Sequence, residues 1–411
     1  MSDMPDKDKI YRFFDNLQFY GFCLILLATP FSLAAIESFF GVVLLSSVVK
    51  LAVRCDLSFI KTRHTALLIL YMLFLALSLF NCGAYLNIGL KAWFFKWGEY
   101  ALMFLAASAT FRSRKRLTAG IQVLIISSFS VLISVVTQIW QGKDILRGRE
   151  LITIAPGVNG ITGSFNSHND LGCYLSIILI LLLAYFLTRH SRRTKILVGL
   201  WSVVICAGLL FTFSRGSWLN FTVAIIFFLA MLRNVTGRVL LKAGIFWFLF
   251  LALILAVPSL KARMLFTFSA EGDALRFSIW KSCWQMIKEH IILGRGLGTF
   301  MSHFPSFSSD FKTAYYAHNC YLQMWVESGL FSLLAFLAFT GSVIVSVWQY
   351  VKRSRDVMKA GLLAGCVGFL AHSFLDTQLY SLQLSALFWI LLGMTAADTR
   401  NVIPARNPDC R

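Results

Sequence analysis

The feature that most constrains this chain is a series of long apolar runs separated by polar segments. Hydrophobic residues make up 58% of its 411 residues, and charged residues only 14%. A water-soluble domain of this length has too few polar residues to cover so much apolar surface. The runs are continuous in Leu, Ile, Phe and Val, without the alternation typical of a membrane β-barrel. We therefore predict an all-α polytopic protein that crosses a membrane many times.

Spanning the hydrocarbon core of a bilayer takes roughly 17–25 apolar residues in a helix. By this measure we predict about twelve transmembrane helices in a single integral membrane domain, residues 1–411. One large polar loop, about 258–329, lies between the ninth and tenth spans. The predicted spans are 14–30, 32–53, 65–81, 88–110, 118–140, 171–188, 196–213, 217–232, 240–257, 330–350, 360–378 and 380–397.

Basic residues are concentrated in alternate loops, for example at 112–116, 189–195 and 352–355. Cytoplasmic loops of membrane proteins carry an excess of Lys and Arg, so this pattern predicts that both termini are cytoplasmic. It explains the net charge of +19 without a nucleic-acid partner. The opposite face then holds the loops at about 141–170 and about 258–329, with a very short turn at 214–216.

Basic residues on that opposite face are exceptions to the excess of Lys and Arg in cytoplasmic loops, so their presence there suggests a function other than orienting the protein. Arg215 lies at the tip of the short turn, where it either snorkels to the interface or binds an anion such as a phosphate. Arg276 falls in the first turn of a predicted amphipathic surface helix, 275–289, which also contains Trp280. An ion pair between Arg276 and Glu271 or Asp273 is an equal alternative.

The polar residues predict neither a metal site nor a cofactor. Glu271 and Asp273 alone supply too few ligands for a divalent cation. No His and Cys residues occur at the spacing of a metal site, and the nine cysteines form no disulfide framework. The glycine-rich segment 293–298, which contains Arg295, follows no strand, and we predict only a turn that closes the surface helix.

His318 is the best candidate for a general base, because an imidazole accepts a proton near neutral pH. It is followed by Asn319 and lies where the large loop returns to the membrane. His168 and Asn169 end the other outer loop, directly before a predicted helix, and capping of that helix is the simpler interpretation. His372 lies inside an apolar run, where we expect a hydrogen bond between helices.

One base and several outward-facing cations beside a membrane suit a specific reaction class. A hydroxyl group would be deprotonated while an anionic leaving group is stabilised. A lipid-borne diphosphate is the substrate class that fits best, because its hydrocarbon chain needs the bilayer.

Four short motifs resemble those of the bacterial O-antigen ligases. His318-Asn319, nine residues and Gly329 are similar to the family's H-[NSQ]-x9-G motif. Ser214-Arg215-Gly216 resembles its S-R-G element, and Arg276 with Trp280 resembles its R-x3-W element. The segment 163–175, which includes His168-Asn169, is similar to another recurring stretch.

This resemblance implies a metal-independent, inverting glycosyltransferase of the GT-C type that needs no cofactor. It implies transfer of O-antigen from undecaprenyl diphosphate to the lipid A–core oligosaccharide, on the periplasmic side of the bacterial inner membrane. By the same resemblance, His318 is the catalytic base, and Arg215 and Arg276 hold the donor diphosphate. Asn319, His168, Asn169 and Arg295 are candidate supporting residues, with no role carried over to His168 or Arg295.

Three alternatives stay open at this point. Related O-antigen polymerases and protein O-oligosaccharyltransferases share the motifs, although the basic outer loop favours a ligase that binds a phosphorylated core. A transporter of lipid-linked glycans is the third alternative. It predicts charges inside spans and inverted repeats. Lys91, Lys96, Glu99 and Asp376 are the candidates for such charges inside the runs, and no repeat is visible.

Overall fold

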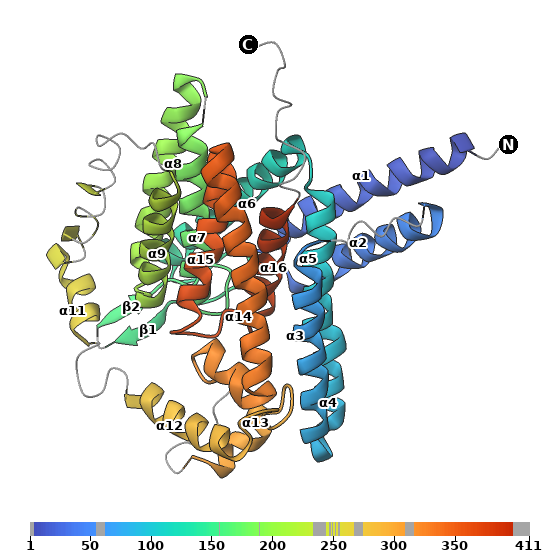
Figure 1. Ribbon diagram of the computed structural model, residues 1–411. Coiled ribbons are helices and arrows are strands. Elements are labelled where there is room, and N and C mark those ends of the chain that lie inside the picture. Colours follow the sequence, from blue (N-terminus) through green and yellow to red (C-terminus); the bar gives the residue numbers. More distant parts are fainter. Residues whose placement is uncertain are drawn as a thin grey trace.

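The structure is a computed structural model that describes residues 4–54, 62–155, 157–188, 190–232, 274–308 and 316–397, together with part of 244–266. In this part of the chain the fold is a bundle of helices with one short β-hairpin (Figure 1). The predicted all-α class is confirmed.

The first half of the bundle consists of helices joined by short turns. Its elements are α1 (Met4–Ala28), α2 (Leu33–Arg54), α3 (Thr65–Leu77), the 3-10 turns η1 (Ser78–Asn81) and η2 (Gly83–Tyr85), α4 (Leu86–Ala92), the π-helical η3 (Trp93–Gly98), α5 (Glu99–Thr110) and α6 (Arg114–Gln141).

The second half begins with an antiparallel hairpin after α6, where the sequence predicts no strand. Its elements are β1 (Ile152–Ala155), β2 (Val158–Gly160), α7 (His168–Leu187), α8 (Arg192–Phe211), α9 (Arg215–Met231), α11 (Pro258–Phe266), α12 (Ala274–Glu289), α13 (Phe300–His303), η4 (Phe304–Ser306), α14 (Cys320–Ser354), α15 (Val357–His372) and α16 (Leu382–Ala396).

Eleven of the twelve predicted spans fall on these helices, and the ninth, 240–257, lies largely outside the described residues. Among the described residues, α2, α6, α7, α8 and α14 are the five helices long and apolar enough to cross a membrane. The chain is thus a multi-pass helical protein, while the count of twelve stays a prediction. The predicted span 360–378 was too long, because α15 ends at His372 and a turn follows.

The centre of the bundle is α7, which is buried at every position from Leu171 to Leu182. A helix that is apolar all round is one that neighbours cover on all sides. Here the neighbours α9 and α15 approach closely at small residues, as is typical of membrane helices. A methyl group on Gly172 would overlap the Ser217 side chain of α9, and one on Gly368 of α15 would overlap Asn220.

A second, smaller core fixes the predicted surface helix at one end of the bundle (Figure 1). Ile279, Cys283, Met286 and Ile287 of α12 are buried together against the segment that follows α12 and the start of α14. The predicted helix 275–289 is confirmed as α12, with Arg276 in its first turn.

The long helix α14 is broken at Gly329, which has φ +80° and ψ 175°. The break frees backbone groups that pair with the predicted glycine-rich turn. The Arg295 and Gly296 amides donate to the carbonyls of Val326 and Glu327, and the Leu330 amide donates to Ile291. The turn predicted to close the surface helix therefore holds α12 against α14. The second part of α14 starts at residue 330, where the tenth predicted span begins.

We expect Gly329→Ala to destabilise the protein by about 1–3 kcal/mol, because its φ is costly for any residue with a Cβ and a methyl group would overlap the Ile292 carbonyl. Gly341→Ala in the same helix is the matched control, since open space surrounds that position. It should leave stability unchanged or raise it by up to about 1 kcal/mol. Thermal unfolding in detergent compares the two, and equal effects would contradict this role of Gly329.

Candidate active site

The N-termini of α7, α9 and α14 lie near one another, joined by hydrogen bonds between their first residues and to the turn after α15. Each is capped by a side chain: Ser167 accepts from an amide of α7, Ser214 from an amide of α9, and Asn319 from two amides of α14. Such residues are the preferred N-caps, because they satisfy amides that a helix leaves unpaired. The positive ends of three helix dipoles therefore point into one region, which favours a bound anion.

Side-chain hydrogen bonds link the first two of these helix ends. The Ser214 hydroxyl donates to the Asn169 amide oxygen at 2.6 Å, and the Ser217 hydroxyl donates to Ser214 at 2.8 Å. His168 is the first residue of α7. The helix is capped by Ser167, so Asn169 is not the cap: it connects α7 to the turn that carries Arg215.

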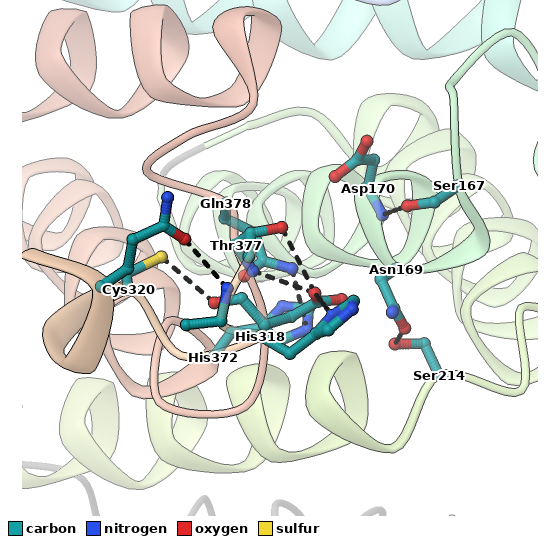
Figure 2. A network of polar contacts seen from close by, with 12 residues as sticks. Ser167, Asn169, Asp170, Ser214, His318, Cys320, His372, Thr377 and Gln378 are labelled. Carbon is teal, nitrogen blue, oxygen red and sulfur yellow. Dashed lines mark hydrogen bonds and ion pairs between the residues drawn. The ribbon is translucent and has the colours of Figure 1, made fainter. Parts of the chain in front are cut away.

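His318, labelled in Figure 2, forms a hydrogen-bonded pair with Asp376, which lies in the turn after α15. The His318 Nδ1 and Asp376 Oδ1 atoms are 3.0 Å apart, and the Thr377 amide also donates to Oδ1. Asp376 is buried, with 8% of its side chain exposed, whereas His318 is 38% exposed. Because an ionised carboxylate only accepts, Nδ1 carries the proton and Nε2 is left as the basic nitrogen.

The environment of Asp376 keeps its carboxyl group ionised. Burial by itself would raise the pKa of Asp376. The hydrogen bond and charge of His318, followed by the charges of Arg276 and His372, outweigh burial and hold this pKa well below its usual range. Arg276 therefore lies within electrostatic reach of the His318–Asp376 pair.

His372 ends α15 in the centre of this region. Its Nε2 lies 3.2 Å from the Gln378 amide nitrogen, so the expected hydrogen bond goes to the following turn and not to another helix. The imidazole packs against Gly216, where a methyl group would overlap the ring. This contact brings the backbone next to Arg215 close to the turn that holds Asp376.

A chain of hydrogen bonds fixes the residue before His318 from both sides. The Trp280 indole Nε1 donates to the Ala317 carbonyl at 2.9 Å, and the Ala317 amide donates to the Gln323 side chain at 3.1 Å. Gln323 in turn donates to the buried Glu327 at 3.2 Å. Because Trp280 lies one turn after Arg276 on α12, this contact couples the surface helix to His318.

Backbone strain marks the same region. Among the described residues, Phe213, His318 and Arg355 are the non-glycine residues with positive φ, and the first two directly precede capping residues of the site, Ser214 and Asn319. A left-handed conformation costs roughly 1–2 kcal/mol for such residues. Strain of this kind gathers at functional sites, where the surrounding structure enforces it.

The structure brings most of the predicted site residues to this end of the bundle. His318, Asn319, His168 and Asn169 lie in the hydrogen-bonded region, Arg276 acts on it through its charge, and the turn with Arg215 borders it. Arg295 lies elsewhere: it pairs with Glu289, and its guanidinium is 4.4 Å from the centre of the Phe307 ring. Glu271 and Asp273 lie outside the described residues. The predicted alternative, an ion pair between one of them and Arg276, therefore stays a prediction. The roles of all these residues stay predictions.

Sequence reasoning missed Asp376 as the partner of His318. An acid inside an apolar run was noted only as a possible transport residue. The Leu375-Asp376-Thr377-Gln378 segment is too polar for the middle of a span, and this signal indicates a turn near the membrane surface. Among the described residues, no group of three or more His, Cys, Asp and Glu side chains is placed to hold a metal ion.

The His318–Asp376 pair should make stability depend on pH. Asp376 has a lowered pKa in the folded protein, so its contribution is present above its unfolded pKa of about 3.9 and is lost as the pH falls further. We expect His318→Ala to lower the unfolding temperature at pH 7, because a buried carboxylate loses its partner. The difference from wild type should shrink as the pH falls below about 4.

The double variant His318→Ala/Asp376→Asn is the control for this titration. This variant has no unpaired carboxylate at position 376, so at pH 7 it should unfold at a higher temperature than His318→Ala. The gap between the two variants should close as the pH falls and the carboxyl group of the single variant becomes protonated. If the single and double variants follow the same pH curve, the two side chains are not coupled.

Comparison with known proteins adds independent support for the resemblance found in the motifs. Residues 200–337 match the family model described as O-antigen ligase, a segment that contains Arg215, Arg276 and His318. A comparison with curated proteins finds no match. The similarity seen in the motifs from Ser214 to Gly329 is thus confirmed by a match over this segment, which is about a third of the chain.

Proposed function

We propose that this protein is a glycosyltransferase that moves O-antigen from undecaprenyl diphosphate to the lipid A–core oligosaccharide in lipopolysaccharide biosynthesis. The observation that carries this proposal is the His318–Asp376 pair, placed where three helix N-termini meet and within reach of the charge of Arg276. The match of residues 200–337 to the O-antigen ligase family model supports the substrate class.

The proposed reaction is a single displacement with inversion at the anomeric carbon. Nε2 of His318 takes the proton of an acceptor hydroxyl while the oxygen forms a new bond to the donor sugar. The bond between that sugar and the diphosphate breaks, and its electron pair leaves with the undecaprenyl diphosphate. Asp376 stabilises the imidazolium that forms and keeps the ring oriented.

The leaving diphosphate is held by positive groups. Guanidinium groups bind phosphate oxygens through paired, charge-assisted hydrogen bonds, and we assign this role to Arg215 and Arg276. The N-terminal ends of α7, α9 and α14 add favourable dipoles. These groups neutralise the leaving group without a metal ion, so we propose a metal-independent reaction of the GT-C type.

The proposed membrane arrangement follows the charge pattern of the loops. We place the single domain, residues 1–411, in the bacterial inner membrane with both termini in the cytoplasm and the site facing the periplasm. In this orientation α12 and the hairpin lie on the outer face. The basic clusters at 112–116 and 352–355 then lie on the cytoplasmic face.

Transfer between the two purified glycolipids is the test of the base. His318→Ala should lower the transfer rate by about 10²- to 10⁴-fold. His290→Ala, at an exposed position just after α12, should leave the rate unchanged. Transfer that survives His318→Ala sinks the base assignment, and loss of wild-type transfer in EDTA sinks the metal-independent mechanism.

Deletion of the gene separates ligase from polymerase. Loss of a ligase leaves bare core beside unattached polymer, whereas loss of a polymerase leaves single repeats on the core. We expect the first pattern.

The contact between Trp280 and Ala317 predicts a positioning role for Trp280. Trp280→Phe keeps an aromatic ring but removes the hydrogen bond to Ala317, so we expect kcat to fall by about tenfold, the equivalent of one lost hydrogen bond, with little change in KM. Trp284→Phe is the matched control, because Trp284 lies on the same helix and is 49% exposed. Equal kcat values for the two variants would remove Trp280 from this role.

A further inference from the structure

A polar pocket lies at the other end of the bundle from the candidate active site. It has a volume of about 460 Å³ and is lined by residues of α6, the end of α7 and the junction of α14 with α15. Helices α7 and α15 each have one end at the active site and the other at this pocket. With a rise of 1.5 Å per residue, the 20 residues of α7 separate the two by about 30 Å, the thickness of the hydrocarbon core.

Three basic side chains from separate segments line this pocket. Arg114 is the first residue of α6, His190 follows α7, and Arg355 is the C-cap that follows α14. The nearest acid in the sequence, Asp356, accepts hydrogen bonds from the amides of Met358 and Lys359 as the cap of α15. The lining of the pocket is therefore positively charged, and the Asp356 carboxylate is occupied as the N-cap of α15.

Two details indicate that the pocket is built for a hydrogen-bond acceptor. The His190 ring stacks on Tyr185 with 4.1 Å between ring centres, and among the described residues its buried Nε2 has no hydrogen-bond partner. The Tyr185 hydroxyl accepts from Gln122 at 3.0 Å, which leaves its own proton to donate.

Arg355 adds a third sign. It has φ +58°, so the backbone adopts a left-handed conformation that favours glycine, yet the position holds arginine. The other two non-glycine residues with positive φ among those described are at the active site. Here the conformation is that of the C-cap of α14, whose amide donates to the Val351 carbonyl, and the residue in place of the usual glycine is a cation that lines the pocket.

We propose that this pocket binds the phosphate group of an anionic membrane phospholipid. The apolar part of the lining, Leu187, Val357 and Met358, suits the glycerol and upper acyl chains of a lipid and does not suit a free anion. Basic pockets between membrane helices are typical sites for lipid head groups. The site is independent of the proposed transfer reaction, because it lies at the opposite membrane surface and shares no residue with it.

The experiment titrates purified protein with phosphatidylglycerol, with phosphatidylethanolamine and with inorganic phosphate. It measures retained lipid by native mass spectrometry and the unfolding temperature. Wild type should retain phosphatidylglycerol and be stabilised by it, and should respond weakly to the other two. An equal response to inorganic phosphate would overturn the lipid assignment.

Two double variants remove the same number of charges. Arg114→Gln/Arg355→Gly acts on the pocket, and glycine suits the backbone at position 355, so this variant should fold. Lys115→Gln/Arg353→Gln acts on exposed neighbours that do not line the pocket. We expect phosphatidylglycerol binding to weaken about 10- to 30-fold in the first variant and to change little in the second. Equal weakening in both, or none in either, would overturn the proposal.

Discussion

The hydrogen bond between His318 and Asp376 is the interaction on which the rest of the site depends. The two side chains come from separate elements, so their contact requires the start of α14 to be fixed against the turn after α15. Backbone and side-chain bonds do this: the Cys320 amide donates to Ser373, and the Tyr321 hydroxyl donates to Leu370. A buried carboxylate is costly unless it is paired, so the imidazole and the acid stabilise each other in one orientation.

The remaining architecture serves to bring helix ends together at this pair. Close packing at Gly172, Gly216 and Gly368 lets α7, α9 and α15 approach with little between them. The break at Gly329 lets the first part of α14 follow the site while the second part runs on as a long apolar helix. In this way the capped N-terminal ends of three apolar helices and several charged side chains lie together at one end of the bundle. A diphosphate is the kind of group that such an arrangement stabilises.

Much of this was predictable from the sequence, for physical reasons. Continuous apolar runs determine helices in a membrane, because no other backbone arrangement satisfies its hydrogen bonds there. His318, Arg215 and Arg276 were predicted as site residues because ionisable residues next to membrane spans are often functional. The surface helix followed from the pattern of Trp280 and its neighbours.

What escaped prediction depends on contacts between distant segments. Asp376 was hidden in a run taken as one long span, since composition does not show where α15 turns back. Gly329 was recognised as part of a motif, but its reason, a close approach to Ile292 and a positive φ, exists only in three dimensions. Arg295 shared the basic loop with the other cations, yet its pairing with Glu289 lies away from the site.

The most direct test of the central claim is an experimental structure of the protein with an unreactive undecaprenyl diphosphate sugar analogue. The account predicts that the diphosphate lies between Arg215 and Arg276 and that the anomeric carbon faces the Nε2 side of His318, with room for a hydroxyl between them. A diphosphate bound away from the three helix ends, or a sugar that cannot reach His318, would contradict it.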